Sequence, residues 1–297
     1  MQTLIVVAIA GLAAQLVDGS LGMGYGLTSS TLLIFAGLTP AAASASVHLA
    51  EVGTTALSGV AHHRFGNVDW HAVRRIAIPG GIGAFLGATL LSSLSTESAK
   101  PLASALLFTL GVYVLLRFLR GKIQVQRKGR PGLRFLAPLG LIGGFVDATG
   151  GGGWGPVTTP TLLADGRLAP NRVIGTVSAS EFIVALSASA GFFTALGGEI
   201  VRLEFVAALL AGGLIAAPIA AYMVRHLNPQ SLGVVVGGFI CFTNARVLLT
   251  AAGISGDAFL LVYAVVVTAW VTAVVSVVRA VRRERSAESS GFTDRSA

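Results

Sequence analysis

The stretch "VDGSLGMGYG", Val17 to Gly26, places four glycines inside a segment that is otherwise apolar enough to lie in a bilayer. It returns as "VDATGGGGWG", Val146 to Gly155, at an offset of 129 residues, with Asp18 matched by Asp147. Two copies of one glycine-rich element, with the same acidic residue in the same place, indicate an internal repeat.

The repeat continues beyond the glycines. Further matches keep the same order, at offsets that grow from 129 to 132: Tyr25 with Trp154, Thr31-Leu32-Leu33 with Thr161-Leu162-Leu163, Pro40 with Pro170, Glu51 with Glu181, and "PGGIGAFLGA" from Pro79 with "AGGLIAAPIA" from Ala211. Short loop insertions produce a drift of this size. The chain is therefore expected to consist of two related halves.

The composition places the chain in a membrane. Hydrophobic residues make up 54% of the 297 residues and charged residues 11%, with a mean hydropathy of +0.78. Soluble domains carry roughly a quarter charged residues, so a soluble globule is excluded. Apolar runs of about 17 to 25 residues, each able to cross the hydrocarbon core as a helix, recur along the chain. We expect a polytopic α-helical protein in contact with the lipid bilayer, in the plasma (inner) membrane of a bacterium.

The net charge of +8 lies largely in two segments, Arg120 to Arg134 and Arg279 to Arg285. Such segments flank membrane helices on the cytoplasmic side, so no nucleic-acid partner is expected. No basic residue precedes the first apolar run, which argues against a cleaved signal peptide. Cys241 is the single cysteine, which excludes an intramolecular disulfide and a thiolate metal site. No metal and no cofactor are expected.

The basic segments also predict the direction of the spans. With the basic tail inside, spans near residues 258–280, 231–251, 205–224 and 173–196 place the connection Asp165 to Arg172 inside as well. The segment 135–164 then begins and ends inside, with "GGFVDATGGGGWGP" at its centre. About a dozen residues of helix remain on each arm, too few for two full crossings. A re-entrant pair of half-helices is expected.

In the first half, the same rule places Arg64, Arg74 and Arg75 inside and the loop Ser95 to Lys100 outside. The first broken segment then enters from outside, so the repeats are expected to be inverted. The predicted fold is an all-α polytopic membrane protein of two inverted repeats, each a re-entrant glycine-broken hairpin plus three transmembrane helices, with one extra C-terminal helix. The predicted boundaries are 1–133 for the first repeat, 134–257 for the second, 258–285 for the final helix and its basic flank, and 286–297 for a cytoplasmic tail.

The two glycine elements, each followed by a proline and then a glutamate-bearing helix, resemble the TauE/SafE family of membrane permeases. The resemblance covers about residues 5 to 280. Members of that family are associated with export of sulfite and organosulfonates. The resemblance therefore implies transport of a small oxyanion or sulfonate, and it brings no catalytic residue with it.

The broken segments are expected to bind the substrate. Unwound backbone within a membrane is tolerated only where protein or a water-filled cavity satisfies its polar groups. A helix that restarts after such a break offers free N–H groups and a positive dipole end to an anion, as discontinuous helices do in secondary transporters. The predicted substrate-binding residues are Gly22, Gly24, Tyr25, Gly26, Thr28, Ser29, Ser30, Gly151, Gly153, Trp154, Gly155, Thr158, Thr159 and Arg246. The alternative is that the glycines serve helix packing and that the hydroxyls bond to backbone carbonyls.

Ionisable residues within the spans are rare and therefore informative. Glu51 and Glu181 occupy equivalent places in the two repeats, and His48 lies one turn before Glu51, where the second repeat has Ser178. Buried carboxyl and imidazole groups can exchange protons near neutral pH, so these residues are predicted to couple transport to protons or another cation. A structural alternative pairs the glutamates with Arg246, which could instead bind an oxyanion in a bidentate manner.

Asp18 and Asp147 precede the breaks, near the negative ends of their half-helices. This position suits a protonated acid, a bound cation or a cap on the glycine turn, and of these the cap is favoured. Both residues are placed in the predicted coupling set with Glu51, Glu181 and His48.

The predicted function is a secondary transporter, an exporter of a small sulfur-containing oxyanion such as sulfite or an organosulfonate, by alternating access around a midplane anion site. A passive anion channel or a membrane subunit without coupling is the alternative. A membrane-embedded enzyme is less favoured, because no H-E-x-x-H or paired Cys/His motif is present. The sequence leaves the anion, the direction of flux, the coupling ion and the oligomeric state open.

Overall fold

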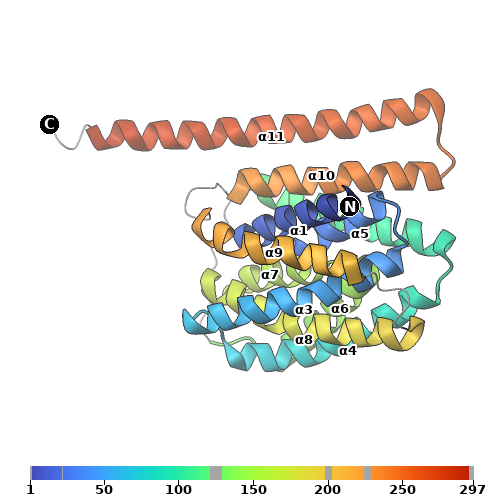
Figure 1. Ribbon diagram of the computed structural model, residues 1–297. Coiled ribbons are helices and arrows are strands. Elements are labelled where there is room, and N and C mark those ends of the chain that lie inside the picture. Colours follow the sequence, from blue (N-terminus) through green and yellow to red (C-terminus); the bar gives the residue numbers. More distant parts are fainter. Residues whose placement is uncertain (1, 22, 121–128, 198–202, 224–228, 294–297) are drawn as a thin grey trace.

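The computed structural model describes residues 2–21, 23–120, 129–197, 203–223 and 229–293, and within these ranges the regular structure is α-helical (Figure 1). The described helices are α1 (Gln2–Leu21), α2 (Tyr25–Phe35), α3 (Pro40–Arg64), α4 (Trp70–Ser93), α5 (Thr96–Leu119), α6 (Leu133–Gly150), α7 (Trp154–Asp165), α8 (Pro170–Leu196), α9 (Leu203–Met223), α10 (Pro229–Ala251) and α11 (Gly256–Thr293). Within this part of the chain, five helical segments are long and apolar enough to cross a membrane: Trp70–Ser93, Thr96–Leu119, Arg172–Leu196, Gly233–Ala251 and Gly256–Val281. The predicted all-α membrane architecture is confirmed.

Each half of the chain contains a helix interrupted by glycines. Residues 22–24 separate α1 from α2, and residues 151–153 separate α6 from α7. Gly24, with a φ of 119°, and Gly151, with a φ of 79°, lie in the left-handed region that residues with side chains avoid. The chain can therefore turn at both breaks. Gly22, one of the predicted substrate residues, lies outside the described residues.

The first arm of the second break is longer than predicted. α6 has 18 residues, which makes about 27 Å of helix at 1.5 Å per residue, where about a dozen residues were expected. The helix runs on through its glycines because Gly140 and Gly144 lie against the backbone of α4, at Ile76 and Gly80. These glycines permit close helix packing, and the break is confined to residues 151–153.

The helices of the two halves pair reciprocally. α1 packs mainly on α9, α6 packs mainly on α4, α3 packs on α8 and α5 packs on α10. In the repeat, α1 corresponds to α6 and α4 corresponds to α9, so each broken segment packs on the fourth helix of the other half. The two halves are thus interleaved, and each helps to hold the break of the other in place.

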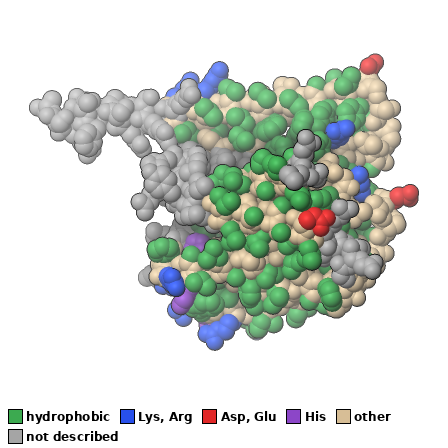
Figure 2. Space-filling view, in the orientation of Figure 1, with side chains coloured by type: hydrophobic (Ala, Val, Ile, Leu, Met, Phe, Trp, Pro, Cys, Tyr) green, Lys and Arg blue, Asp and Glu red, His purple; other side chains and the backbone are tan. Residues whose placement is uncertain are grey.

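Arginine side chains gather at one end of the bundle. The carboxylate of Asp69, which caps α4, lies 3.5 Å from Nε of Arg130 and 3.9 Å from Nη1 of Arg172. The start of α4, the residues before α6 and the start of α8 therefore lie together, and we call this the arginine end. Figure 2 shows Lys, Arg and His side chains gathered at the lower left of the visible face.

α2 ends at the other end of the bundle. Its last residue, Phe35, lies beside the start of α5 and the last turns of α10, in contact with Arg246. We call this the Lys100 end, after the residue of α5 that lies there. α7, in contrast, leads back to the arginine end, because a short connection joins it to α8. The short helices that restart after the two breaks therefore point toward opposite ends.

α11 lies on the outside of α10 (Figure 1). Its apolar residues Leu260, Leu261 and Val265 are exposed, as expected for a helix that faces lipid. It takes no part in the centre of the bundle, where the two breaks lie.

Candidate functional site

The two breaks are in direct contact. The backbone of Gly26, in the first turn of α2, lies against the backbone of Gly152, so that a Cβ on Gly26 would be 2.7 Å from the Gly152 Cα. The hydroxyl of Ser30 donates a hydrogen bond across the contact to the carbonyl of Gly151. Two interruptions that are 129 residues apart in the sequence therefore form one unit.

Asp147 bridges the second break. Its Oδ1 accepts hydrogen bonds from the backbone N–H groups of Gly153, at 2.6 Å, and Trp154, at 2.9 Å. In the first half, the carboxylate of Asp18 accepts a hydrogen bond from the backbone N–H of Tyr25. Each aspartate therefore caps the helix that restarts after its break, which is the role the sequence favoured. The helix N-termini that were predicted to face a substrate anion are held by the protein's own carboxylates.

His48 connects the second break to α3. Its Nε2 lies 3.0 Å from Oδ2 of Asp147, and its Nδ1 lies 2.7 Å from the carbonyl oxygen of Ser44. The Ser44 hydroxyl donates to the carbonyl of Ala148, at 2.8 Å. α3 and α6 are thereby joined by a buried polar network at the level of the break.

Glu51 lies one turn further along α3, fully buried. Its Oε2 is 4.0 Å from Nε2 of His48, beyond hydrogen-bond distance, and neither carboxylate oxygen has a hydrogen-bond partner among the described residues. A buried carboxylate without a partner is costly, so the position favours a bound proton or another cation.

A small polar cavity lies between Glu51 and its counterpart Glu181. It is lined by Gln15, Asp18, Tyr25, Glu51, Thr54, Thr55, Ser58, Ser178 and Glu181. Its volume of about 10 Å³ is of the order needed for a single water molecule. Together with His48 and Asp147, the three carboxylates of this cavity form what we call the acidic cluster: Asp18, His48, Glu51, Asp147 and Glu181.

The acidic cluster draws its members from α1, α3, α6 and α8, which are the first and third helices of each half. All five members were predicted as coupling residues, and the structure brings them together. Ligand atoms of His48, Glu51 and Asp147 lie within 4.8 Å of one another and could hold a metal ion, a possibility that the sequence did not indicate. The cluster is asymmetric, because His48 bonds to Asp147 whereas its counterpart Ser178 lines the open cavity beside Asp18.

The predicted hydroxyl ligands divide into two groups. Thr28 Oγ1 and Ser29 Oγ are buried and have no hydrogen-bond partner among the described residues. Thr158 instead donates to the backbone carbonyl of Trp154, at 2.5 Å, as the packing alternative expected, and Ser30 is engaged with Gly151. Ser29 therefore remains on α2 as a donor for a ligand, whereas Thr28 lies in a groove lined by apolar side chains of α1, α10 and α11. Thr159 is also buried.

The aromatic residues after the breaks anchor their helices. Trp154 is fully buried and donates from Nε1 to the carbonyl of Val177, at 3.2 Å. Tyr25 donates from its hydroxyl to the carbonyl of Leu209, at 3.3 Å, and also lines the acidic cavity. Gly155, in the first turn of α7, is buried behind Trp154.

The sequence pattern described as "Sulfite exporter TauE/SafE" matches residues 7–247, a range that contains both breaks and the whole acidic cluster. The chain belongs to the TauE/SafE family. It is 54% identical, over 279 residues that cover 93% of each chain, to a protein of Bacillus subtilis strain 168 named "Probable membrane transporter protein YtnM". No solved structure matches the chain. The protein is an integral membrane protein and a membrane transporter.

One predicted pairing is wrong for this TauE/SafE protein. Arg246 is exposed at the Lys100 end, with its guanidinium 5.6 Å from the ring centre of Phe35. Within the described residues, no ion pair joins it to Glu51 or Glu181. The reason is its depth, since Arg246 lies in the last two turns of α10 and the glutamates lie in the middle of their helices.

The sequence reasoning missed several residues around the TauE/SafE breaks. Ser44 stands one turn before His48, a spacing that places both on one helix face and could have indicated a shared network. Gln15 stands one turn before Asp18 in the same way. Lys100, in a segment predicted to be an outside loop, lies in the first two turns of α5, and no motif around it indicated a ligand.

Proposed function

We propose that the protein is a secondary transporter that exports a small sulfur-containing oxyanion, such as sulfite or an organosulfonate, by alternating access around the two breaks. The observation that carries the proposal is the contact between the breaks at Gly26 and Gly152, beside a buried acidic cluster. Paired discontinuous helices with ionisable residues beside them are the arrangement that secondary transporters use for substrate and coupling ion. The family description and the name of the Bacillus relative support the substrate class and the transport activity.

The proposed substrate site lies at the contact between the breaks. Ser29 supplies a hydroxyl donor that has no partner among the described residues. Thr28 is not assigned to this site, because it lies in a groove lined by apolar side chains of α1, α10 and α11. The N–H groups of Gly153 and Trp154 supply further donors when Asp147 releases them. An anion that takes the place of this carboxylate would meet the same geometry, because both are oxygen acceptors at a helix N-terminus.

The acidic cluster requires a cation to accompany the anion. Four carboxylates, with one imidazole among them, repel a negative ligand unless protons or another cation neutralise part of their charge. We assign this role to Glu51 and Glu181, with His48 and Asp147 as the connection to the second break. Binding of the cation and binding of the anion then favour each other, and by linkage the effect is reciprocal.

The direction of the short helices supports two inverted repeats, 1–133 and 134–257, followed by the final helix 258–285 and the tail 286–297. α2 and α7 occupy equivalent places in the repeats and point toward opposite ends of the bundle. With the arginine end in the cytoplasm, the first hairpin opens outward and the second inward.

Flux through proteoliposomes tests the proposal. Purified full-length protein should give saturable, gradient-dependent movement of sulfite and of an alkanesulfonate, with counterflow when unlabelled anion is present on the far side. Liposomes without protein provide the control. Flux that rises linearly with concentration and shows no counterflow would indicate a passive channel and would refute the transporter mechanism.

A further inference from the structure

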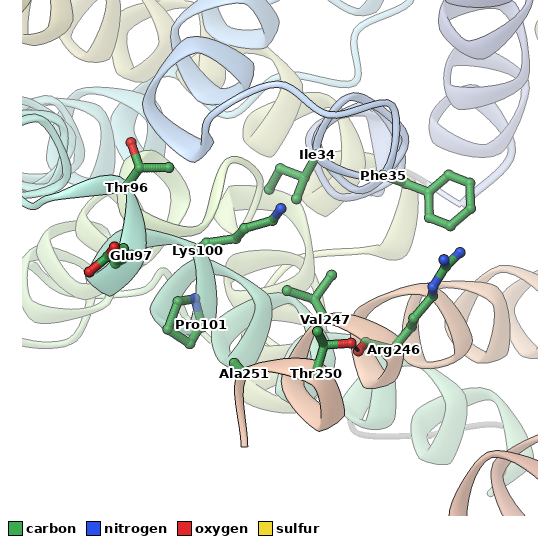
Figure 3. A pocket seen from close by; sticks show the side chains of 10 residues that line it. All are labelled: Ile34, Phe35, Thr96, Glu97, Lys100, Pro101, Arg246, Val247, Thr250 and Ala251. Carbon is green, nitrogen blue, oxygen red and sulfur yellow. Dashed lines mark hydrogen bonds between the residues drawn. The ribbon is translucent and has the colours of Figure 1, made fainter. Parts of the chain in front are cut away.

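A second cavity, lined by both apolar and polar side chains, lies at the Lys100 end of the bundle (Figure 3). Its volume is about 480 Å³, and it is formed where α2 ends, α5 begins and α10 ends. Lys100 and Arg246 extend from α5 and α10 toward the end of α2, while the carboxylate of Glu97 points away from both. We call this cavity the vestibule.

The two cations of the vestibule are available to a ligand. Neither Lys100 nor Arg246 forms an ion pair with a carboxylate within the described part of the chain. Among the described lysines and arginines, they are the two that lie at this end of the bundle, since the others lie toward the arginine end. Membrane proteins usually carry their excess of Lys and Arg on the cytoplasmic side, so two cations on the face predicted to be outside are an exception to this rule. Two cations in one hollow create a local positive potential that attracts anions.

The vestibule is connected to the second break by α5. Leu106 packs against Gly150, the last residue of α6, and Lys100 precedes it by six residues, about 9 Å along a helix. Ser104 lies between them, one turn from Lys100 on the same helix face. Its hydroxyl is fully buried and has no hydrogen-bond partner among the described residues. A buried hydroxyl therefore lies on α5 between the levels of Lys100 and Leu106.

α2 links the vestibule to the first break. Arg246 lies over Phe35, the last residue of α2, and Asn244 of α10 donates from Nδ2 to the Thr31 hydroxyl, at 3.1 Å. α2 begins at the break and has 11 residues, about 16 Å. An ion held by Arg246 therefore lies against the far end of the helix whose near end forms the proposed substrate site.

We infer that the vestibule is a second anion site, in which Lys100 and Arg246 hold a small oxyanion on its way between the outer face and the breaks. The inference rests on the proposed function, because that function makes the ligand an anion. The acidic cavity has room for about one water molecule and is lined by three carboxylates. The vestibule is far larger and is lined by two cations and one carboxylate, Glu97, and neither cation forms an ion pair within the described residues. Arg246 suits two oxygens of one ligand, and Lys100 adds a point charge.

The test measures the apparent KM for sulfite, applied from the vestibule side, with full-length protein in proteoliposomes. Lys100→Gln and Arg246→Gln should each raise this KM about threefold to tenfold, and the double variant should raise it further. Arg246→Lys, which keeps the charge but loses the two-pronged guanidinium, should raise the KM less than Arg246→Gln does. Arg64→Gln is the matched control, because it removes an exposed cation at the arginine end. In wild-type protein the same KM should rise with ionic strength, and this dependence should disappear in the double variant.

The outcomes separate this inference from the proposed function. Wild-type KM and wild-type salt dependence in the double variant would overturn the vestibule site while leaving transport intact. If wild-type protein moves no sulfite but binds it in calorimetry, and the double variant loses this binding, the site stands and the transport function fails. If the double variant does not fold, a salt-independent KM in wild-type protein would still overturn the site.

Discussion

His48 and Asp147 join the two halves of the chain through the break. Nε2 of His48 lies 3.0 Å from Oδ2 of Asp147, and both side chains are buried. Oδ1 of the same carboxylate holds the start of α7. One side chain of the second half is thereby fixed both to its own broken helix and to the third helix of the first half.

This bond predicts a large loss of stability in His48→Ala. The substitution leaves a buried carboxylate oxygen without its partner, which costs on the order of 3 kcal/mol. Asp147→Asn should be milder, because the amide oxygen can still accept from the N–H groups of α7. Thermal unfolding in detergent measures both. A His48→Ala protein as stable as wild type would show that the bond does not hold the halves together.

A second prediction concerns the pH dependence of transport. Glu51 faces Asp147, Asp18 and Glu181, each on another helix, as well as His48 and Tyr25. Protons bound here reduce the negative charge, so the apparent KM for an alkanesulfonate, which stays ionised throughout, should fall as pH falls.

Glu51→Gln and Glu181→Gln should each flatten this dependence while counterflow remains measurable. Asp257→Asn, which alters an exposed carboxylate at the start of α11, serves as the control. An unchanged pH profile in both well-folded glutamine variants would remove the glutamates from the coupling mechanism.

The hydroxyls near the breaks give a third prediction. Ser29 has no partner in the described structure, whereas Thr158 is bonded to the carbonyl of Trp154. Ser29→Ala should therefore weaken anion affinity by roughly fivefold to tenfold, the equivalent of about 1 kcal/mol, and Thr158→Ala should leave it nearly unchanged. Titration of purified protein with sulfite measures this difference. A larger effect at Thr158 would move the site from α2 to α7.

A fourth prediction uses glycines inside helices, where alanine brings no backbone strain. A Cβ on Gly26 would meet the Gly152 backbone, which cannot move aside, whereas a Cβ on Gly53 would meet the end of the flexible Leu210 side chain. Gly26→Ala should destabilise the protein by roughly 1 to 3 kcal/mol and reduce flux at least tenfold. Gly53→Ala should keep wild-type flux. Equal flux in the two variants would mean that Gly26 and Gly152 can move apart without reducing transport.

The fifth prediction is topological. Ser95→Cys should react with an impermeant thiol reagent from outside, and Arg64→Cys should react from the cytoplasm, in a Cys241→Ala background. The loop Gly121 to Arg130 and the tail Ser286 to Ala297 are also predicted to be cytoplasmic. Most of the loop and the side chains of the tail lie outside the described part of the structure, so Ser95 and Arg64 are chosen for labelling instead. Reaction of both positions from one side would contradict the proposed orientation.

The interrupted helices could be predicted because their cause is local. Glycine clusters inside apolar segments, and a carboxylate just before each cluster, leave a direct mark on the sequence. The cap formed by Asp147 follows from the same local pattern, since the residue stands six positions before Gly153 and reaches its N–H group across the turn.

Contacts between distant segments could not be predicted from local sequence patterns of this kind. The approach of Gly26 to Gly152 depends on the interleaving of the halves, and nothing in either glycine element specifies the packing of α1 on α9. The depth of Arg246 was misjudged because a long side chain near the end of a span can reach the surface. The arms of the second break were misjudged because a glycine that packs a helix and a glycine that ends one look alike in a sequence.

The difference between His48 and Ser178 has a consequence for the transport cycle. In the proposed alternating-access mechanism, two identical inverted repeats would give inward-open and outward-open forms that are related by a two-fold rotation and have equal free energy, so each would be half populated. The bond from His48 to Asp147 has no counterpart between Ser178 and Asp18 in the described structure. A hydrogen bond to a carboxylate is worth about 1.5 to 3 kcal/mol, so a bond present in only one of the two forms would give a ratio of roughly 10 to 150 between them. In the proposed mechanism, a single histidine, present in one copy of a duplicated element, would give the empty transporter a preferred resting side.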